Sequence, residues 1–114
     1  MYRASKTFRF SAAHKLIPPY EGPCSRTHGH DYKVEIVVCA ETLNPCGMVV
    51  DFHDLAPLSH YLKQRFDHAT VNDTVEQPTA ENIARHIFDW AAAHWQVSSV
   101  RVWETDTAWG GYSR

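Results

Sequence analysis

Alternating apolar and polar side chains predict that the chain opens with two strands. In residues 6–14 the apolar side chains occupy every second position, which is the period of a half-buried strand. The same period runs through residues 28–39, where valine and isoleucine side chains share one face. Prolines and a glycine within residues 16–27 exclude a regular ladder, so we expect a loop between the two strands.

The rest of the chain predicts a third strand, two helices and a fourth strand. An Asn-Pro-Cys-Gly turn precedes residues 48–52, which we expect to pair back as a hairpin. Apolar residues at helical spacing predict helices over residues 54–66 and 80–94, the second with Thr79 as its N-cap. Side chains of the two faces alternate again in residues 100–105, which predicts the fourth strand. The predicted order is therefore β-β-β-α-α-β.

This grouping of strands and helices indicates an α+β fold, a four-stranded antiparallel sheet covered on one face by two helices. A length of 114 residues suits one core, so we expect residues 1–114 to form a single domain. So small a sheet leaves two open edges with unpaired backbone groups. We therefore expect subunits to continue the sheet edge to edge in a homo-oligomer.

Composition and charge exclude several classes of protein. The chain is 44% hydrophobic and 21% charged, which is enough to fill a core and excludes disorder. A net charge of −2 without any basic run gives no electrostatic footprint for nucleic acid. No apolar run is long enough for a signal peptide or a membrane span. With three cysteines, an odd number, we expect reduced thiols and a cytoplasmic location.

Three of the eight histidines are predicted to converge at one end of the sheet. His28 and His30 lie two residues apart on the second strand and share the face of its apolar residues. His14 ends the apolar face of the first strand. Three imidazoles with an open fourth position form a catalytic zinc arrangement. On the residues alone, the alternative is three strand-end histidines that are hydrogen-bonded or solvated.

Four further residues carry candidate chemistry. Cys24 lies four residues before His28, where a thiol near a cation can act as base or nucleophile, or can be an inert loop cysteine. Asp67 precedes His68 and can fix its tautomer, although a helix cap beside a solvated histidine has the same pattern. Glu104 stands where a core residue is expected. It either meets a ligand with paired N–H donors or faces water at a frayed strand end.

Six short motifs follow one another along the chain: Phe10-Ser11-Ala12-Ala13-His14, Cys24-x₃-His28-Gly29-His30, Val50-Asp51-Phe52, Phe66-Asp67-His68, Pro78-Thr79-Ala80-Glu81-Asn82 and Trp103-Glu104-Thr105. With these motifs the chain resembles the 6-pyruvoyltetrahydropterin synthase and 6-carboxytetrahydropterin synthase family from residue 8 to about residue 105. The resemblance implies the tunnelling fold (T-fold). In that fold four-stranded sheets join into a barrel-like trimer, and two trimers stack into a hexamer with active sites at subunit boundaries.

The resemblance also implies a role for each candidate residue. It implies a zinc ion held by three imidazoles, those of His14, His28 and His30. It implies that Cys24 is the general base. It also implies that Asp67 and His68 form a proton-relay pair, which comes from a neighbouring subunit. It implies that the pterin ring is bound by Glu104, with Thr105 beside it.

Enzymes similar to this chain act on 7,8-dihydroneopterin triphosphate. In the carboxy branch the side chain is cleaved, releasing acetaldehyde and triphosphate, and the product enters the 7-deazaguanine route to queuosine. In the pyruvoyl branch the side chain is kept. The resemblance implies the carboxy branch, because that branch's bacterial enzymes have the Cys-x₃-His-Gly-His spacing found here, whereas animal pyruvoyl enzymes have a longer gap.

Two other readings stay open beside the pyruvoyl branch. One is a non-catalytic oligomer that binds pterin or zinc, and the other is a T-fold enzyme acting on a different purine or pterin. The low net charge gives no general attraction for a triphosphate, which leaves Lys15, Arg26 and Lys33 as local candidates. Glu21 lies in the same loop as Cys24, and some relatives use a glutamate there for a folate-directed reaction.

Overall fold

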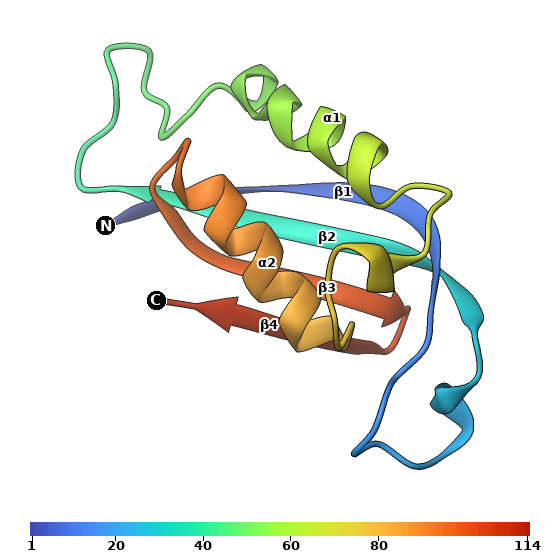
Figure 1. The fold of residues 1–114 in the computed structure, drawn as a ribbon. Coiled ribbons are helices and arrows are strands. Elements are labelled where there is room, and N and C mark those ends of the chain that lie inside the picture. Colours follow the sequence, from blue (N-terminus) through green and yellow to red (C-terminus); the bar gives the residue numbers. More distant parts are fainter.

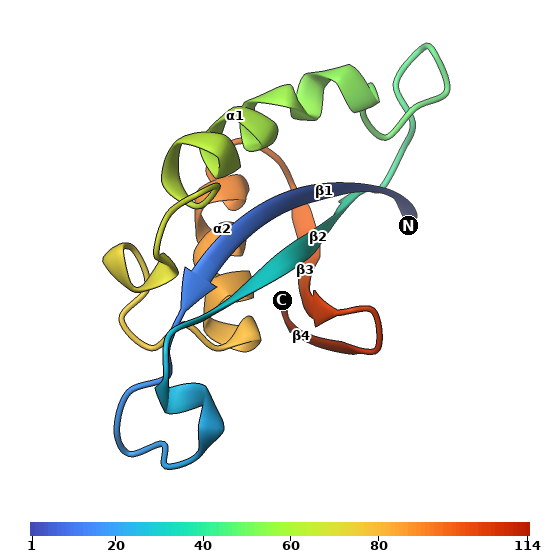
Figure 2. The same cartoon turned by 90° about the vertical axis from the view of Figure 1, so that its right-hand side faces the viewer.

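A four-stranded antiparallel sheet forms one layer of the molecule and two helices form the other (Figure 1). The computed structural model describes residues 1–114. The strands follow the order β1-β2-β3-β4 across the sheet, with these bounds: β1 Tyr2–His14, β2 His28–Ala40, β3 Val97–Thr105 and β4 Ala108–Ser113. The α1 helix (Ala56–Arg65) and the α2 helix (Ala80–Ala92) lie on the same side of the sheet (Figure 2). The predicted α+β class is confirmed.

The predicted order of elements is wrong in two places. Residues 48–52 form no strand; a 3₁₀ helix, Phe52–Leu55, leads instead into α1. The predicted turn does form, since the Asn44 amide donates to the Met48 carbonyl at 2.9 Å, but no ladder extends from it. A fourth strand, β4, follows β3 directly and was not predicted. The observed order is therefore β-β-α-α-β-β.

The missed strand contains a glycine pair that hides its alternation. Gly110 is buried where β4 passes under the start of α2. A Cβ there would lie 2.8 Å from the backbone nitrogen of Glu81, closer than side chains approach backbone. Glycine thus allows the helix and the strand to pack closely. Because glycine has no side chain, the apolar residue that would have indicated a strand is missing at this position.

The core lies between the helices and the apolar face of the sheet. The strand register places Phe10 opposite Tyr32 and Val34 opposite Val102. The two helices cover these residues with aliphatic side chains that are fully buried: Leu58 and Leu62 from α1, Ile83 and Ile87 from α2. The predicted spacing of these helical positions is confirmed.

The boundaries of α2 show one correct and one wrong prediction. Thr79 is the N-cap, and its side chain accepts a hydrogen bond from the Asn82 amide. The helix ends at Ala92, two residues earlier than predicted, and His94 is exposed beyond it rather than part of the buried stripe. Neither helix is long and apolar enough to cross a membrane.

Candidate metal centre and neighbouring groups

Three histidine side chains meet where β1 ends and β2 begins. The antiparallel register pairs His14 with His28 and Ala12 with His30, which brings the three imidazoles to one end of the sheet. Their potential ligand atoms all lie within 4.8 Å of one another. The His14 and His28 Nε2 atoms are 3.0 Å apart. The structure thus brings together the three residues that the sequence analysis grouped.

Backbone carbonyls orient two of these rings. The Nδ1 atom of His14 lies 2.8 Å from the Pro78 carbonyl oxygen, and that of His28 lies 2.7 Å from the Arg26 carbonyl oxygen. A carbonyl oxygen only accepts hydrogen bonds, so each Nδ1 carries the hydrogen and each Nε2 presents a lone pair. A second partner that fixes the tautomer in this way is typical of metal-binding histidines.

Burial favours the neutral form of His14. Its side chain is 1% exposed, and desolvation lowers its pKa below the ordinary histidine value. The hydrogen bond to Pro78 and the nearby Glu104 carboxylate act in the opposite direction but do not reverse the shift. A histidine must be neutral to bind a metal. Three imidazole nitrogens converging in this way fit a zinc ion.

Glu104 lies beside the cluster from the end of β3. Its Oε2 atom is 3.3 Å from Nε2 of His14 and 3.6 Å from Nε2 of His30. This carboxylate, whose side chain is 30% exposed, therefore lies against the histidines, and its binding of a ligand with paired N–H donors stays a prediction. Thr105 turns elsewhere, because its hydroxyl accepts from the Thr107 amide at 3.4 Å.

Tyr32 is the member of this region that the sequence analysis missed. Its hydroxyl is the one buried side-chain polar atom without a hydrogen-bond partner. Its ring centroid lies 5.7 Å from that of His14 and 5.4 Å from that of His30. Burial, and then the charge of Glu104, raise the pKa of this phenol. The available signal was its position two residues after His30, on the same face of β2.

Tyr32→Phe is expected to stabilise the metal-free protein by about 1–2 kcal/mol, because it removes a buried hydroxyl that makes no hydrogen bond and keeps the ring. The matched control is Tyr61→Phe. The Tyr61 hydroxyl lies 2.6 Å from His86 Nε2, so its removal is expected to lower the free energy of unfolding. Urea denaturation measures both, and equal destabilisation by the two variants would contradict the assignment.

Asp67 and His68 form a pair at the outer edge of β1. The Asp67 Oδ1 atom accepts from the Ser11 amide at 2.9 Å, and Oδ2 lies 3.0 Å from His68 Nδ1. The hydrogen bond from Ser11 is the main cause that lowers the pKa of Asp67, so the carboxylate is ionised and orients the imidazole. The His68 side chain is 84% exposed and the residue has a φ of 59°.

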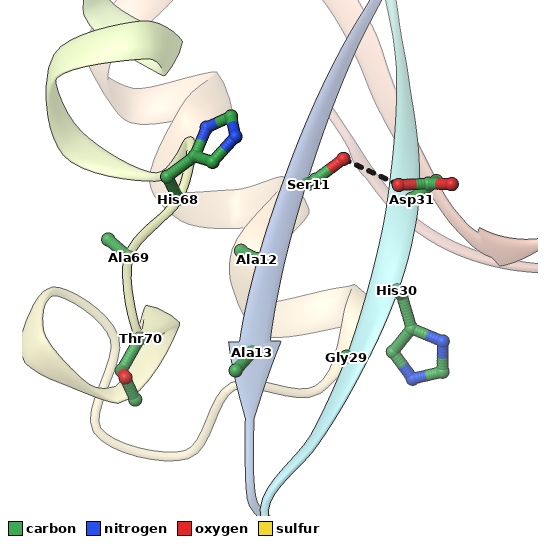
Figure 3. Close-up of a pocket in the computed structure, with 9 residues that line it drawn as sticks. All are labelled: Ser11, Ala12, Ala13, Gly29, His30, Asp31, His68, Ala69 and Thr70. Carbon is green, nitrogen blue, oxygen red and sulfur yellow. Dashed lines mark hydrogen bonds between the residues drawn. The ribbon is translucent and has the colours of Figure 1, made fainter.

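The pair is separated from the histidine cluster within one chain. His68 and His30 border the same hollow, but His68 lies beyond the outer edge of β1 whereas His30 projects from β2 on the other side of that strand (Figure 3). Between them, the Ser11 hydroxyl donates to Asp31 Oδ1 at 2.5 Å. One chain therefore leaves His68 free at the surface.

Cys24 lies in the loop between β1 and β2, in the 3₁₀ helix Pro23–Ser25. It is half-buried, and its thiol is not among the ligand atoms of the histidine cluster. Its carbonyl accepts from the Leu16 amide at 2.8 Å, and its amide donates to the Tyr20 hydroxyl at 3.3 Å. The backbone of Cys24 is thus held on both sides.

The basic residues that were candidates for the triphosphate lie in the loop between β1 and β2 and on β2 itself. Lys15 and Arg26 are exposed at the two ends of the loop, and Glu21 is exposed within it. Lys33 lies on the sheet face without helices, where its Nζ atom is 4.2 Å from the ring centroid of Trp103.

Comparison with known proteins identifies the family. The family model described as 6-pyruvoyl tetrahydropterin synthase matches residues 3–114, and the chain belongs to this family. The 6-carboxy-5,6,7,8-tetrahydropterin synthase of Synechocystis sp. is 41% identical over 95 residues, which cover 77% of this chain and 73% of the relative. The enzyme of the same name from Haemophilus influenzae is 30% identical, with 98% and 99% covered.

Solved structures agree on the fold. The 6-pyruvoyl tetrahydropterin synthase of Caenorhabditis elegans superimposes with a TM-score of 0.86, covering 99% of this chain and 95% of that one. The two sequences are 24% identical, so this likeness shows the shared fold. The arrangement of two helices on a four-stranded sheet is therefore that of the T-fold.

Proposed function

We propose that this protein is a zinc-dependent 6-carboxy-5,6,7,8-tetrahydropterin synthase of the cytoplasm. It converts 7,8-dihydroneopterin triphosphate into 6-carboxytetrahydropterin with release of acetaldehyde and triphosphate, a step toward queuosine and other 7-deazaguanines. The observation that carries the proposal is the cluster of His14, His28 and His30 with Glu104 beside it. The identity to carboxy-branch relatives supports this choice of product.

The three histidines would hold a zinc ion through ring nitrogens, Nε2 in the case of His14 and His28. A zinc ion bound there would supply a Lewis acid that makes hydroxyls of the substrate side chain more acidic. Glu104 binds the ring, since its two carboxylate oxygens can accept from the paired N–H donors of a pterin. Its contacts of 3.3 and 3.6 Å with the histidines support a binding site for the ring next to the proposed zinc site.

Proton transfer falls to Cys24 and to the Asp67–His68 pair. Cys24 is the general base, accepting a proton from the substrate side chain as a thiolate. Asp67 holds the His68 imidazole at 3.0 Å, and His68 moves a second proton. Because His68 is exposed and lies across β1 from His30 of its own chain, we propose that it serves the site of a neighbouring subunit. The enzyme then acts as a homo-oligomer, a dimer of trimers.

Mass analysis of the pterins formed from 7,8-dihydroneopterin triphosphate by zinc-loaded protein tests the proposed function. We expect 6-carboxytetrahydropterin together with acetaldehyde and triphosphate. A 6-pyruvoyl product would be consistent with the proposed site residues but would contradict the proposed reaction. Pterin binding without consumption would favour a non-catalytic binding protein.

A further inference from the structure

Segment 68–77 pairs with the outer edge of β1 near the end of that strand. The His68 amide donates to the Ser11 carbonyl at 2.6 Å, and the Ala13 amide donates to the Ala69 carbonyl at 3.0 Å. Figure 3 shows this segment beside the end of β1, to which it runs parallel. Every second residue of a strand turns its N–H and C=O groups to the same edge, so this pairing uses the odd-numbered residues of β1.

The pairing continues past the end of β1 through two side-chain amides. Asn72 Oδ1 accepts from the Lys15 amide at 3.0 Å, and Asn72 Nδ2 donates to the Lys15 carbonyl at 2.9 Å. Gln77 binds Ile17 in the same way, at 2.8 and 2.9 Å. Each carboxamide thus meets one backbone donor and one backbone acceptor, which fixes its orientation. Each side chain forms a two-bond clamp on the backbone, as a neighbouring strand would.

Residues 15–17, which the two clamps hold, contact Cys24 directly. The Leu16 amide, which lies between the two clamped residues, donates to the Cys24 carbonyl at 2.8 Å. Pro18 and Pro19 follow and have no N–H with which to extend a ladder. Figure 1 shows the rest of this loop, between β1 and β2, projecting beyond the end of the sheet. The two clamps therefore lie at the base of the loop that carries Cys24.

Gln77 also lies next to the histidine cluster and is anchored to α2. Its carbonyl accepts from Asn82 Nδ2 at 3.0 Å, in the first turn of the helix. Pro78 follows it, and the Pro78 carbonyl oxygen lies 2.8 Å from His14 Nδ1. The Gln77 clamp therefore connects the loop to the same backbone stretch that orients the first histidine of the cluster.

We propose that Asn72 and Gln77 are positioning residues, which hold the loop between β1 and β2 in the place where Cys24 acts. This proposal rests on the proposed function, in which Cys24 is the general base. Neither amide touches a reacting atom or moves a proton. Each keeps residues 15–17 extended, and the hydrogen bond from Leu16 passes this constraint to Cys24. Loss of either clamp is expected to open the loop locally and to leave the core closed.

Limited proteolysis by trypsin tests the clamps, because the loop contains two cleavage sites, after Lys15 and after Arg26. Both side chains are exposed. Cleavage of a locally opened state follows the population of that state. In Gln77→Met and in Asn72→Leu, which each lose the two hydrogen bonds of one clamp, loop cleavage is expected to be about tenfold faster. Cleavage after Arg65, at the end of α1, is expected to stay unchanged.

Turnover separates a positioning role from a merely structural one. In zinc-loaded Gln77→Met, kcat for the pterin triphosphate is expected to fall about tenfold, because the loop no longer presents Cys24 in one place. The change in KM is expected to stay below about threefold, and the zinc content is expected to equal that of the parent protein. A parent-level kcat together with faster loop cleavage would overturn the positioning role.

Two further variants make the test specific. Gln64→Met, at an exposed glutamine of α1, is the matched control and is expected to equal the parent protein in both assays. Gln77→Glu keeps the shape and the acceptor for the Ile17 amide but has no N–H for the Ile17 carbonyl, so it is expected to speed loop cleavage. Parent-level cleavage in Gln77→Glu would overturn the proposal. Equal acceleration after Arg65 would overturn it too, because the whole protein would then be loosened.

The proteolysis experiment contains no pterin and no turnover. If the proposed function is wrong, the zinc-loaded parent protein leaves the pterin triphosphate unconsumed while Gln77→Met is still cleaved faster in the loop. If only the role of the clamps is wrong, the parent protein turns over and loop cleavage in Gln77→Met is unchanged. The two failures are therefore distinguishable.

Discussion

His28→Ala is expected to abolish zinc binding and turnover together. The substitution removes one of three imidazoles whose ligand atoms lie within 4.8 Å of one another, and two protein ligands hold zinc poorly. Metal content after dialysis, measured by mass spectrometry, and pterin consumption are the two readouts. The His28 ring also contacts the Arg26 carbonyl, so the substitution removes a hydrogen bond to the loop. Circular dichroism must therefore accompany the assay to show that the variant is folded.

His53→Ala is the matched control for this experiment. The His53 side chain is 96% exposed and contacts only the neighbouring Asp51, so its removal is expected to leave zinc and activity unchanged. Stoichiometric zinc retained in His28→Ala would contradict the ligand assignment. Loss of zinc in both variants would mean that the metal binds exposed histidines without a defined site.

Cys24→Ala is expected to lower turnover by about two to four orders of magnitude, which is the usual contribution of a positioned acid or base. The variant should keep its zinc and the oligomeric state of the parent protein, because the thiol is not among the ligand atoms of the cluster. Steady-state kinetics with the pterin triphosphate, together with metal content and gel filtration, separate these effects.

Cys46→Ala provides the comparison for Cys24→Ala. Cys46 is an exposed cysteine in the turn after β2, and its substitution is expected to leave turnover at the parent level. Near-native turnover of Cys24→Ala would remove this thiol from the mechanism and leave the zinc site as the remaining part of the assignment.

Strands and helices whose pattern repeats over many residues could be predicted from the sequence. The alternation in β1 and β2 and the helical spacing in α1 and α2 each extend over several buried positions, and the structure confirms them. Residues 48–52 are apolar enough for a strand but do not form the predicted hairpin with β2. Both edges of β2 are already occupied, one by β1 and the other by β3. Sheet pairing is a property of the whole fold, so a short local pattern could not decide it.

Part of the candidate site could likewise be predicted from the sequence, and part of it could not. His28 and His30 share a face because side chains alternate along any strand, and His14 joins them because the two strands have matching apolar faces. The sequence therefore sufficed to group the three histidines. It could not place Glu104, because the contact with His14 depends on the register between β2 and β3.

By itself, the sequence determined the α+β class, the apolar faces and the residues available for a metal centre, because these follow from periods along one element. Only the tertiary structure decided three other features. It left the Tyr32 hydroxyl without a partner, placed His68 across β1 from His30 and brought the Tyr20 hydroxyl to the Cys24 amide. Each of these features depends on contacts between different parts of the folded chain, and the pattern of residues along a single element does not predict such contacts. The Tyr32 hydroxyl, in particular, becomes buried without a hydrogen-bond partner only when the helices pack on the sheet.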